Sequence, residues 1–263
     1  MRIALVSLDQ EWLDKDSNFV KCQDSVKKAV DTGCDLVIFP EMTLTGFSPE
    51  TESIVESSPN SETLERFGKL SKKNGINIIF GVCLMENSSE KPFNMLCLAD
   101  AAGYVRPLYA KIHLFSYSNE DDYLSPGSKI VTEKIGDTNF GFAICYDLRF
   151  PELFSIMSSA CRAIVVIANW PEAREDHWHT LLKARAIENE VIIFGVNRVG
   201  VDGNGIGYKQ GSVMILPDGS IQKPVETFSF LNIYNMDGEQ VERYRKTFPT
   251  IKDKMFSLYK RYL

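Results

Sequence analysis

The 263-residue sequence has a formal charge of -6, and 44% of its residues are hydrophobic, which is typical of a folded globular protein rather than a disordered one. This acidic balance argues against a nucleic-acid partner, because binding a phosphate backbone requires a basic surface. A membrane partner is not expected either, because no apolar run approaches the roughly 20 residues that span a bilayer and no signal peptide is recognisable.

Strand-like and helix-like segments alternate along the chain. The predicted strands, in chain order, are Ile3–Leu8, Asp35–Phe39, Ile76–Leu84, Phe93–Leu98, Tyr104–Tyr109, Ile130–Val131, Phe140–Ile144, Ala163–Ala168, Val191–Val196, Ser212–Leu216 and Phe228–Ile233. The predicted helices are Ser17–Thr32, Glu62–Lys73 with Ser61 as its N-cap, Pro151–Ala160, Asp176–Glu188 and Asp237–Arg245. Helical crossovers and hairpin-length turns both occur between strands, so we expect mixed sheets covered by helices on their outer faces.

No composition shift or linker divides the chain, so we expect a single domain over residues 1–263. The segment Lys111–Gly127 is predicted to be a long loop. A C-terminal tail begins at about residue 248 and carries several apolar residues, which are Phe256, Leu258, Tyr259, Tyr262 and Leu263. An apolar chain end rarely stays exposed, so this tail is expected to pack either on its own domain or on a partner.

Six cysteines occur without a CxxC pair, and they are Cys22, Cys34, Cys83, Cys97, Cys145 and Cys161. Their apolar or helical surroundings favour reduced thiols over a disulfide framework, which predicts a cytoplasmic protein. Cys145 differs from the others because it ends a buried strand and is followed by polar and aromatic residues. A cysteine at such a turn projects its sulfur from the sheet, as in a nucleophile elbow, so Cys145 is a candidate nucleophile.

Other chemically capable side chains also follow predicted strands. Glu41, Lys111, Asn169 and Trp170 each come after such a strand. Because ligands of α/β sheets bind beyond the carboxyl ends of strands, we expect these residues to converge with Cys145 on one pocket.

The proton acceptor for a cysteine nucleophile is expected to be a carboxylate here. Only three histidines occur, and His177 and His179 do not share a helix face, which also makes them a poor metal clamp. Glu41 is the candidate base, since Pro40 before it and apolar residues after it hold it in place. The glycines at 203, 205 and 207 do not match a dinucleotide-binding fingerprint and predict a tightly turning loop.

Three segments resemble the signature segments of the carbon–nitrogen hydrolase (nitrilase) superfamily. They are PEMTLTGF around Glu41, AKIHLF around Lys111 and GFAICYDLRFPELF around Cys145. The resemblance covers nearly the whole chain, and the order of the three residues suits the family. The segment NWPEAREDHWHTLLKARAIENEVIIFGVNRVGVDGNG is similar to the ω-amidase (YafV-like) branch, whereas CYDLRFPEL also occurs in relatives that hydrolyse deaminated glutathione.

The resemblance implies a four-layer αββα sandwich in the α/β class, and it assigns roles to residues of the three segments. Glu41 becomes the general base, Lys111 the residue that stabilises charge and Cys145 the nucleophile. Glu120, nine residues after Lys111, matches a second acidic residue that orients the site. We expect the Lys111 cation to lower the pKa of the Cys145 thiol, and Lys111 with the backbone N–H of Tyr146 to stabilise the oxyanion.

The implied reaction is hydrolysis of a small ω-amide, such as 2-oxoglutaramate or 2-oxosuccinamate, to an acid and ammonia through a cysteine thioester. No metal or organic cofactor is required. Arg149 and Arg174 are candidates to bind a substrate carboxylate, and Trp170 is a candidate pocket residue. Two alternatives stay open, which are a deaminated glutathione amidase and a non-catalytic relative that only binds a ligand.

Members of this superfamily commonly dimerise through one helical layer, so the resemblance also implies a homodimer. The expected two-fold interface is built from the helices Pro151–Ala160 and Asp176–Glu188, with the tail as a cover.

Overall fold

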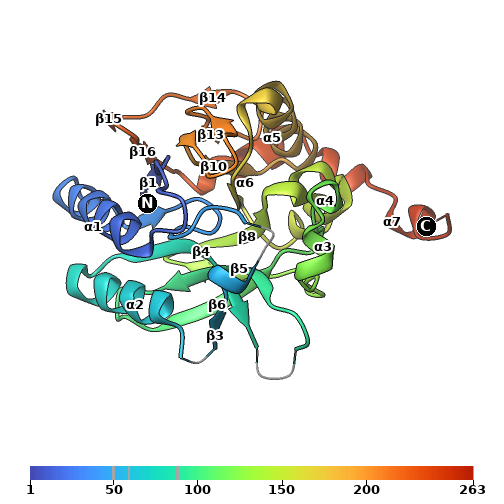
Figure 1. Ribbon diagram of the computed structural model, residues 1–263. Helices are drawn as coiled ribbons and strands as arrows, with labels where there is room; N and C mark the ends of the chain where they lie inside the picture. The colour runs from blue at the N-terminus through green and yellow to red at the C-terminus, as the bar shows by residue number, and fades with distance from the viewer. Residues whose placement is uncertain (49–50, 59, 87–88, 263) are drawn as a thin grey trace.

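The computed structural model describes every residue except 49–50, 59, 87–88 and 263 (Figure 1). Its strands are β1 (Arg2–Val6), β2 (Leu36–Ile38), β3 (Glu56–Ser57), β4 (Asn77–Met85), β5 (Phe93–Ala99), β6 (Val105–Ala110), β7 (Thr132–Ile135), β8 (Thr138–Ile144), β9 (Ala163–Ala168), β10 (Ile192–Asn197), β11 (Gly200–Val201), β12 (Gly207–Tyr208), β13 (Val213–Ile215), β14 (Ile221–Gln222), β15 (Glu226–Phe228) and β16 (Leu231–Asn235). Its α-helices are α1 (Lys15–Asp31), α2 (Glu62–Asn74), α3 (Glu120–Tyr123), α4 (Pro151–Met157), α5 (Glu175–Asn189), α6 (Glu239–Thr247) and α7 (Phe256–Tyr259). The 3-10 helices are η1 (Thr51–Ser53), η2 (Ser116–Ser118), η3 (Cys145–Arg149), η4 (Glu172–Arg174) and η5 (Thr250–Asp253).

The strands form two mixed sheets and one small hairpin. The first sheet runs in the order β15-β16-β1-β2-β4-β5-β6, with β3 beside β4, and the second runs β14-β13-β10-β9-β8-β7. β1, β2 and β4 are parallel to one another, as are β8, β9 and β10. The strands joined by short turns, such as β4 to β5 and β5 to β6, are antiparallel, as hairpin connections require.

The layering follows from the alternation of side chains along each strand. On β1, Ile3 and Leu5 face the core between the two sheets, whereas Ala4 and Val6 face α1 and α2. On β8, Phe142 joins the core between the sheets, while Ala143 packs under α4 and α5. Figure 1 shows the resulting helix–sheet–sheet–helix arrangement, so the predicted four-layer αββα fold is confirmed.

Helix α2 illustrates how the sequence sets an element's ends. The Ser61 hydroxyl accepts a hydrogen bond from the Leu64 N–H at 3.1 Å, which satisfies a backbone donor that has no partner inside the helix. The helix ends at Gly75, whose φ of 63° lies in the left-handed region that glycine adopts without strain. The predicted cap at Ser61 is therefore confirmed.

Three predicted elements differ from the structure in position or type, and the helix predicted at Pro151–Ala160 ends earlier, at Met157. The strand expected at Ile130–Val131 lies instead at Thr132–Ile135, because the turn after it fixes the pairing with β8. The run Phe228–Ile233 is not one strand: it turns at Ser229, whose φ is 48°, and contributes to β15 and β16. The long loop after Lys111 contains two short helical turns, η2 and α3.

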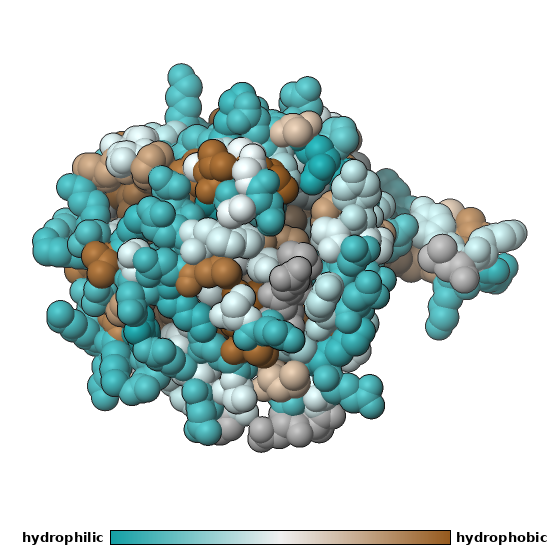
Figure 2. Space-filling view, in the orientation of Figure 1, coloured by the Kyte–Doolittle hydropathy of each residue, from teal (hydrophilic) through white to brown (hydrophobic). Residues whose placement is uncertain are grey.

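The C-terminal tail projects from the body of the molecule (Figures 1 and 2). Its apolar side chains are largely exposed, with Phe248 at 57%, Phe256 at 47% and Tyr259 at 48%, and Leu263 lies outside the described residues. The inner faces of α4 and α5 pack on their own sheet, while Ile156 and Ile187 remain exposed. The homodimer stays a prediction.

Across the described residues, no helix combines the length and apolar character needed to cross a membrane.

Candidate active site

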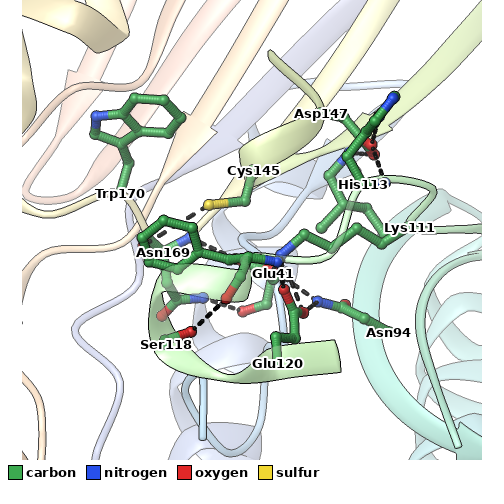
Figure 3. A network of polar contacts seen from close by, with 12 residues as sticks. Glu41, Asn94, Lys111, His113, Ser118, Glu120, Cys145, Asp147, Asn169 and Trp170 are labelled. Atoms are coloured by element: carbon green, nitrogen blue, oxygen red, sulfur yellow. Dashed lines mark hydrogen bonds and ion pairs between the residues drawn. The ribbon is translucent and has the colours of Figure 1, made fainter. Parts of the chain in front are cut away.

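Both sheets deliver polar side chains to the same end of the molecule. Glu41 follows β2 and Lys111 follows β6, while Cys145 begins η3 directly after β8. β2 and β6 end at the same edge of the first sheet, because β2 is parallel to β4, β4 is antiparallel to β5, and β5 is antiparallel to β6. Figure 3 shows the three side chains pointing toward one another. The structure thus brings together residues that lie up to 104 positions apart in the sequence.

Lys111 is the centre of a buried ionic network. Its Nζ lies 3.3 Å from Oε1 of Glu41, and 3.0 and 2.8 Å from the two carboxylate oxygens of Glu120. All three side chains are 1% exposed or less. Burial alone lowers the pKa of Lys111, but the two carboxylates raise it by more, so the ammonium stays charged. A fixed positive charge therefore lies at the base of the site.

The Glu41 carboxylate is held by donors from both sheets. The Asn94 side-chain amide on β5 donates to Glu41 Oε1 at 2.7 Å, and the Asn169 backbone N–H after β9 donates to Oε2 at 2.8 Å. The Asn169 side chain also donates to the Glu41 carbonyl at 2.7 Å. These contacts fix the carboxylate in one orientation beside Lys111.

Cys145 sits on a sharp turn between β8 and η3. Its φ of 45° lies in the left-handed region, which costs a residue other than glycine about 1–3 kcal/mol. The buried Asp147 carboxylate holds this turn, because it accepts hydrogen bonds from the Ile144 N–H at 3.0 Å, the Tyr109 hydroxyl at 2.8 Å and the His113 N–H at 2.9 Å. The strained turn projects the thiol from the sheet, as expected for a nucleophile elbow.

The surroundings of the Cys145 thiol favour its protonated form. Burial and the Glu41 carboxylate raise the pKa of this thiol well above its usual value, and Lys111 lowers it by less. The lowering by Lys111 that the sequence predicts is therefore present, but burial and the Glu41 carboxylate outweigh it. The thiol must give up its proton during attack, and a carboxylate beside it can accept that proton.

This protonation state predicts how iodoacetamide labelling depends on pH. Alkylation of Cys145 should be slow at pH 7 and rise about tenfold per pH unit up to pH 9, because only the thiolate reacts. The other five cysteines are buried, so a Cys145→Ser variant should take up almost no label. Mass spectrometry of labelled peptides measures both rates. A labelling rate that is already flat between pH 6 and 9 would contradict a thiol that is protonated at rest.

A cavity of about 150 Å³ opens above these residues. Glu41, Lys111 and Cys145 line its base, and the predicted pocket residues Tyr146, Arg149, Trp170 and Arg174 all line it as well. Glu120 lies behind Lys111 and is fully buried. The structure therefore gathers every predicted site residue around one cavity, with Glu120 as a supporting neighbour.

The two arginines at the cavity are held by aromatic rings. The Arg149 guanidinium lies 4.8 Å from the centre of the Trp170 ring and hydrogen-bonds His177 at 3.2 Å. The Arg174 guanidinium lies 5.6 Å from the centre of the Phe115 ring. Neither arginine forms an ion pair with a carboxylate of the described chain. Both can therefore bind an anionic group of a ligand.

Two parts of the site were missed by sequence analysis. Asn94 lies inside β5, and the only signal for it is a polar residue in an otherwise apolar strand. The glycine-containing segment predicted as a tight loop forms the β11–β12 hairpin, and its residues Asp202, Asn204 and Tyr208 line the cavity. The residues that the structure describes contain no group of three or more His, Cys, Asp or Glu side chains placed to bind a metal.

Comparison with known proteins agrees with this architecture. The family model of the carbon–nitrogen hydrolases matches residues 2–246, so the chain belongs to that family, whose members hydrolyse carbon–nitrogen bonds. The chain is 30% identical over 254 residues to the Omega-amidase YafV of Escherichia coli, covering 96% of each protein. It is also 30% identical over 195 residues to the 2-oxoglutaramate amidase of Bacillus subtilis, covering 72% of this chain and 75% of that protein. These similarities make the protein an amidase of the nitrilase superfamily.

A solved structure shares the fold over nearly the whole chain. A carbon–nitrogen hydrolase superfamily protein of Xanthomonas campestris superimposes with a TM-score of 0.87 at 29% identity, covering 97% of both chains. That structure carries an arsenic adduct in its active site.

Proposed function

We propose that this protein hydrolyses the terminal amide of a small ω-amide that carries a carboxylate at its other end, with 2-oxoglutaramate or 2-oxosuccinamate as the substrate. One observation carries the proposal. A buried carboxylate and a buried ammonium lie with the partly exposed Cys145 thiol at the base of a small cavity, whose wall holds Arg149 and Arg174 without carboxylate partners in the described chain. The amide would bind at the base, and the substrate carboxylate would bind the arginines.

In the proposed reaction, Glu41 accepts the proton of the Cys145 thiol while the sulfur attacks the amide carbon. Lys111 and the Tyr146 backbone N–H stabilise the oxyanion, a contribution worth about 3–4 kcal/mol per donor in other hydrolases. The carbon–nitrogen bond then breaks, and Glu41 passes its proton to the departing ammonia. Glu41 next takes a proton from water, whose oxygen attacks the thioester. The carbon–sulfur bond then breaks to release the acid, and Glu41 returns its proton to the departing thiolate.

The deaminated glutathione amidase remains the second candidate, because the segment CYDLRFPEL occurs in those relatives. The cavity of about 150 Å³ favours the smaller ω-amides over a peptide-like substrate. The name of the Bacillus subtilis relative, a 2-oxoglutaramate amidase, points the same way.

Product release from a substrate panel tests this proposal. Ammonia is measured for the ω-amides, the nitrile and the N-carbamoyl compound, and the freed dipeptide amine is measured for deaminated glutathione. The panel holds 2-oxoglutaramate, 2-oxosuccinamate, deaminated glutathione, a small nitrile and an N-carbamoyl compound. We expect one of the two 2-oxo ω-amides to give the highest kcat/KM. A nitrile that is hydrolysed faster than every amide would refute the proposed substrate class, and preference for deaminated glutathione would favour the second candidate.

The role of the arginines has a matched test. Arg149→Gln or Arg174→Gln should raise KM for the carboxylate-bearing ω-amide by about 10–100-fold, because a charged hydrogen bond contributes about 1.5–3 kcal/mol. The same variants should leave the KM of a neutral amide of equal length within about threefold. If both variants treat the charged and the neutral amide alike, the arginines do not bind the carboxylate.

A further inference from the structure

The turn that carries Glu41 has an unusual backbone. Met42, directly after Glu41, has a φ of 43° although it is not a glycine, and it is fully buried. Gly81 on β4 allows this turn to lie against the sheet, because a Cβ on Gly81 would come within 2.5 Å of the Met42 nitrogen. A strained turn of this kind needs contacts that hold it in place, since it costs about 1–3 kcal/mol.

Gln10 supplies those contacts from the loop after β1. Its side-chain amide nitrogen lies 3.1 Å from the Glu41 carbonyl, 3.0 Å from the Met42 carbonyl and 3.1 Å from the Thr43 carbonyl. The residue is 1% exposed. One amide group therefore gathers three consecutive carbonyl oxygens, which fixes the direction in which the Glu41 side chain leaves the backbone.

Arg198 holds Gln10 in turn. Its guanidinium donates to the Gln10 carbonyl at 2.9 Å and is fully buried. The same guanidinium lies 4.6 Å from the centre of the Tyr208 ring, and Tyr208 lines the cavity. Arg198 thus connects the cavity wall on the β11–β12 hairpin to the loop that holds the Glu41 turn.

We propose that Gln10 is a positioning residue for the reaction, which acts by holding the Glu41 carboxylate where it can take the Cys145 proton, with Arg198 as its anchor. This inference rests on the proposed role of Glu41 as the base. Neither residue touches the cavity base directly. Their effect is therefore on the geometry of proton transfer, where a displacement of about 1 Å can reduce the rate a hundredfold.

Asn18 on α1 provides a matched control. It is also a fully buried amide, and its Nδ2 donates to the carbonyls of Glu11 and Leu44 at 2.7 and 2.8 Å. It therefore binds the residues that flank the Gln10 contacts, one position beyond Gln10 and one beyond Thr43. Loss of Asn18 should affect stability in the same region without touching the Glu41 carbonyl.

The experiment compares Gln10→Met with Asn18→Leu, two changes that replace an amide by an apolar side chain of similar size. Gln10→Met should lower kcat about 10–100-fold with KM within about threefold of wild type. Asn18→Leu should lower Tm about as much as Gln10→Met does, while its kcat stays within about threefold of wild type. Equal kcat losses in the two variants would overturn the proposal.

A double-mutant cycle separates this inference from the proposed function. If Gln10 acts through Glu41, Gln10→Met should cause no further loss of kcat in a Glu41→Gln background. Additive losses would show that Gln10 acts elsewhere. If Glu41→Gln alone left kcat unchanged, the proposed base itself would be wrong, which is a different outcome.

Gln10→Glu provides a second variant in case Gln10→Met does not fold. Its ionised carboxylate would face three carbonyl oxygens, whereas its protonated form regains one donor. The ratio of its kcat to that of wild type should therefore rise as pH falls. A kcat equal to that of wild type at every pH would contradict the positioning role, because neither form of the carboxyl group can bind the three carbonyl oxygens as the amide does.

Discussion

Replacing Cys145 by alanine or serine is expected to reduce the kcat for amide hydrolysis by at least about a thousandfold, because no thioester can form without the thiolate. The serine hydroxyl is a poor substitute, since a carboxylate deprotonates it far less readily than a thiol. The fold should survive, because the residue is small and lies at the end of β8, and its positive φ is held by Asp147 rather than by its own side chain.

The measurement is single-substrate kinetics of ammonia release, with circular dichroism and thermal unfolding as controls for folding. Substitution of Cys83 by alanine is the matched control, since this thiol is buried in β4 and lies outside the cavity. Retention of more than a few per cent of wild-type kcat by Cys145→Ala would exclude it as the nucleophile.

Glu41→Gln is expected to lower kcat for amides by about 10²–10⁴-fold, which is the usual contribution of a general acid–base group. Glutamine keeps the shape of the side chain but cannot accept the thiol proton. Its NH2 group would also face one of the present donors, which are the amide of Asn94, the ammonium of Lys111 and the N–H of Asn169.

The leaving group gives this prediction a sharper test. Ammonia needs a proton to depart, whereas the alcohol of an activated ester departs with little help. The loss caused by Glu41→Gln should therefore be larger for an ω-amide than for the activated ester of the same acid. Equal losses for both substrates would remove Glu41 from the step that protonates ammonia and leave it the role of accepting the thiol proton.

Most of what could be predicted about the site came from polar side chains that follow the predicted strands. Glu41 and Cys145 each stand where an apolar run stops and Lys111 follows a predicted strand, whereas the roles of the three residues came from the resemblance of their segments to a known family. The function of Gln10 and Asn94 could not be predicted, because each acts on Glu41 through a contact between segments that are 31 and 53 positions apart.

The errors in the predicted strands have the same origin. Apolar character over Phe228–Ile233 hid a turn at Ser229, because exposed Phe230 extends the apolar run through the turn itself. The position of β7 is set by the two-residue turn at 136–137, where Gly136 has a φ of 59° and Thr138 begins β8. Pairing with a neighbouring strand outweighed the local preference of Ile130 and Val131.

The protonation state of Cys145 also could not be inferred from the motif. The sequence indicates a lysine and a glutamate near the thiol, but the net effect depends on burial and on how Lys111 shares its charge with Glu120. Only the assembled geometry shows that burial and Glu41 outweigh the cation.

Partitioning of the acyl group between water and hydroxylamine tests the central claim most directly. The wild-type protein is given glutaramate or monomethyl glutarate, an amide and an ester that carry the same acyl group. Neither has an oxo group that hydroxylamine would attack. If both substrates pass through one thioester on Cys145, the ratio of hydroxamate to free acid must be the same for the two leaving groups at a given hydroxylamine concentration. A ratio that depends on the leaving group would contradict a common acyl-enzyme.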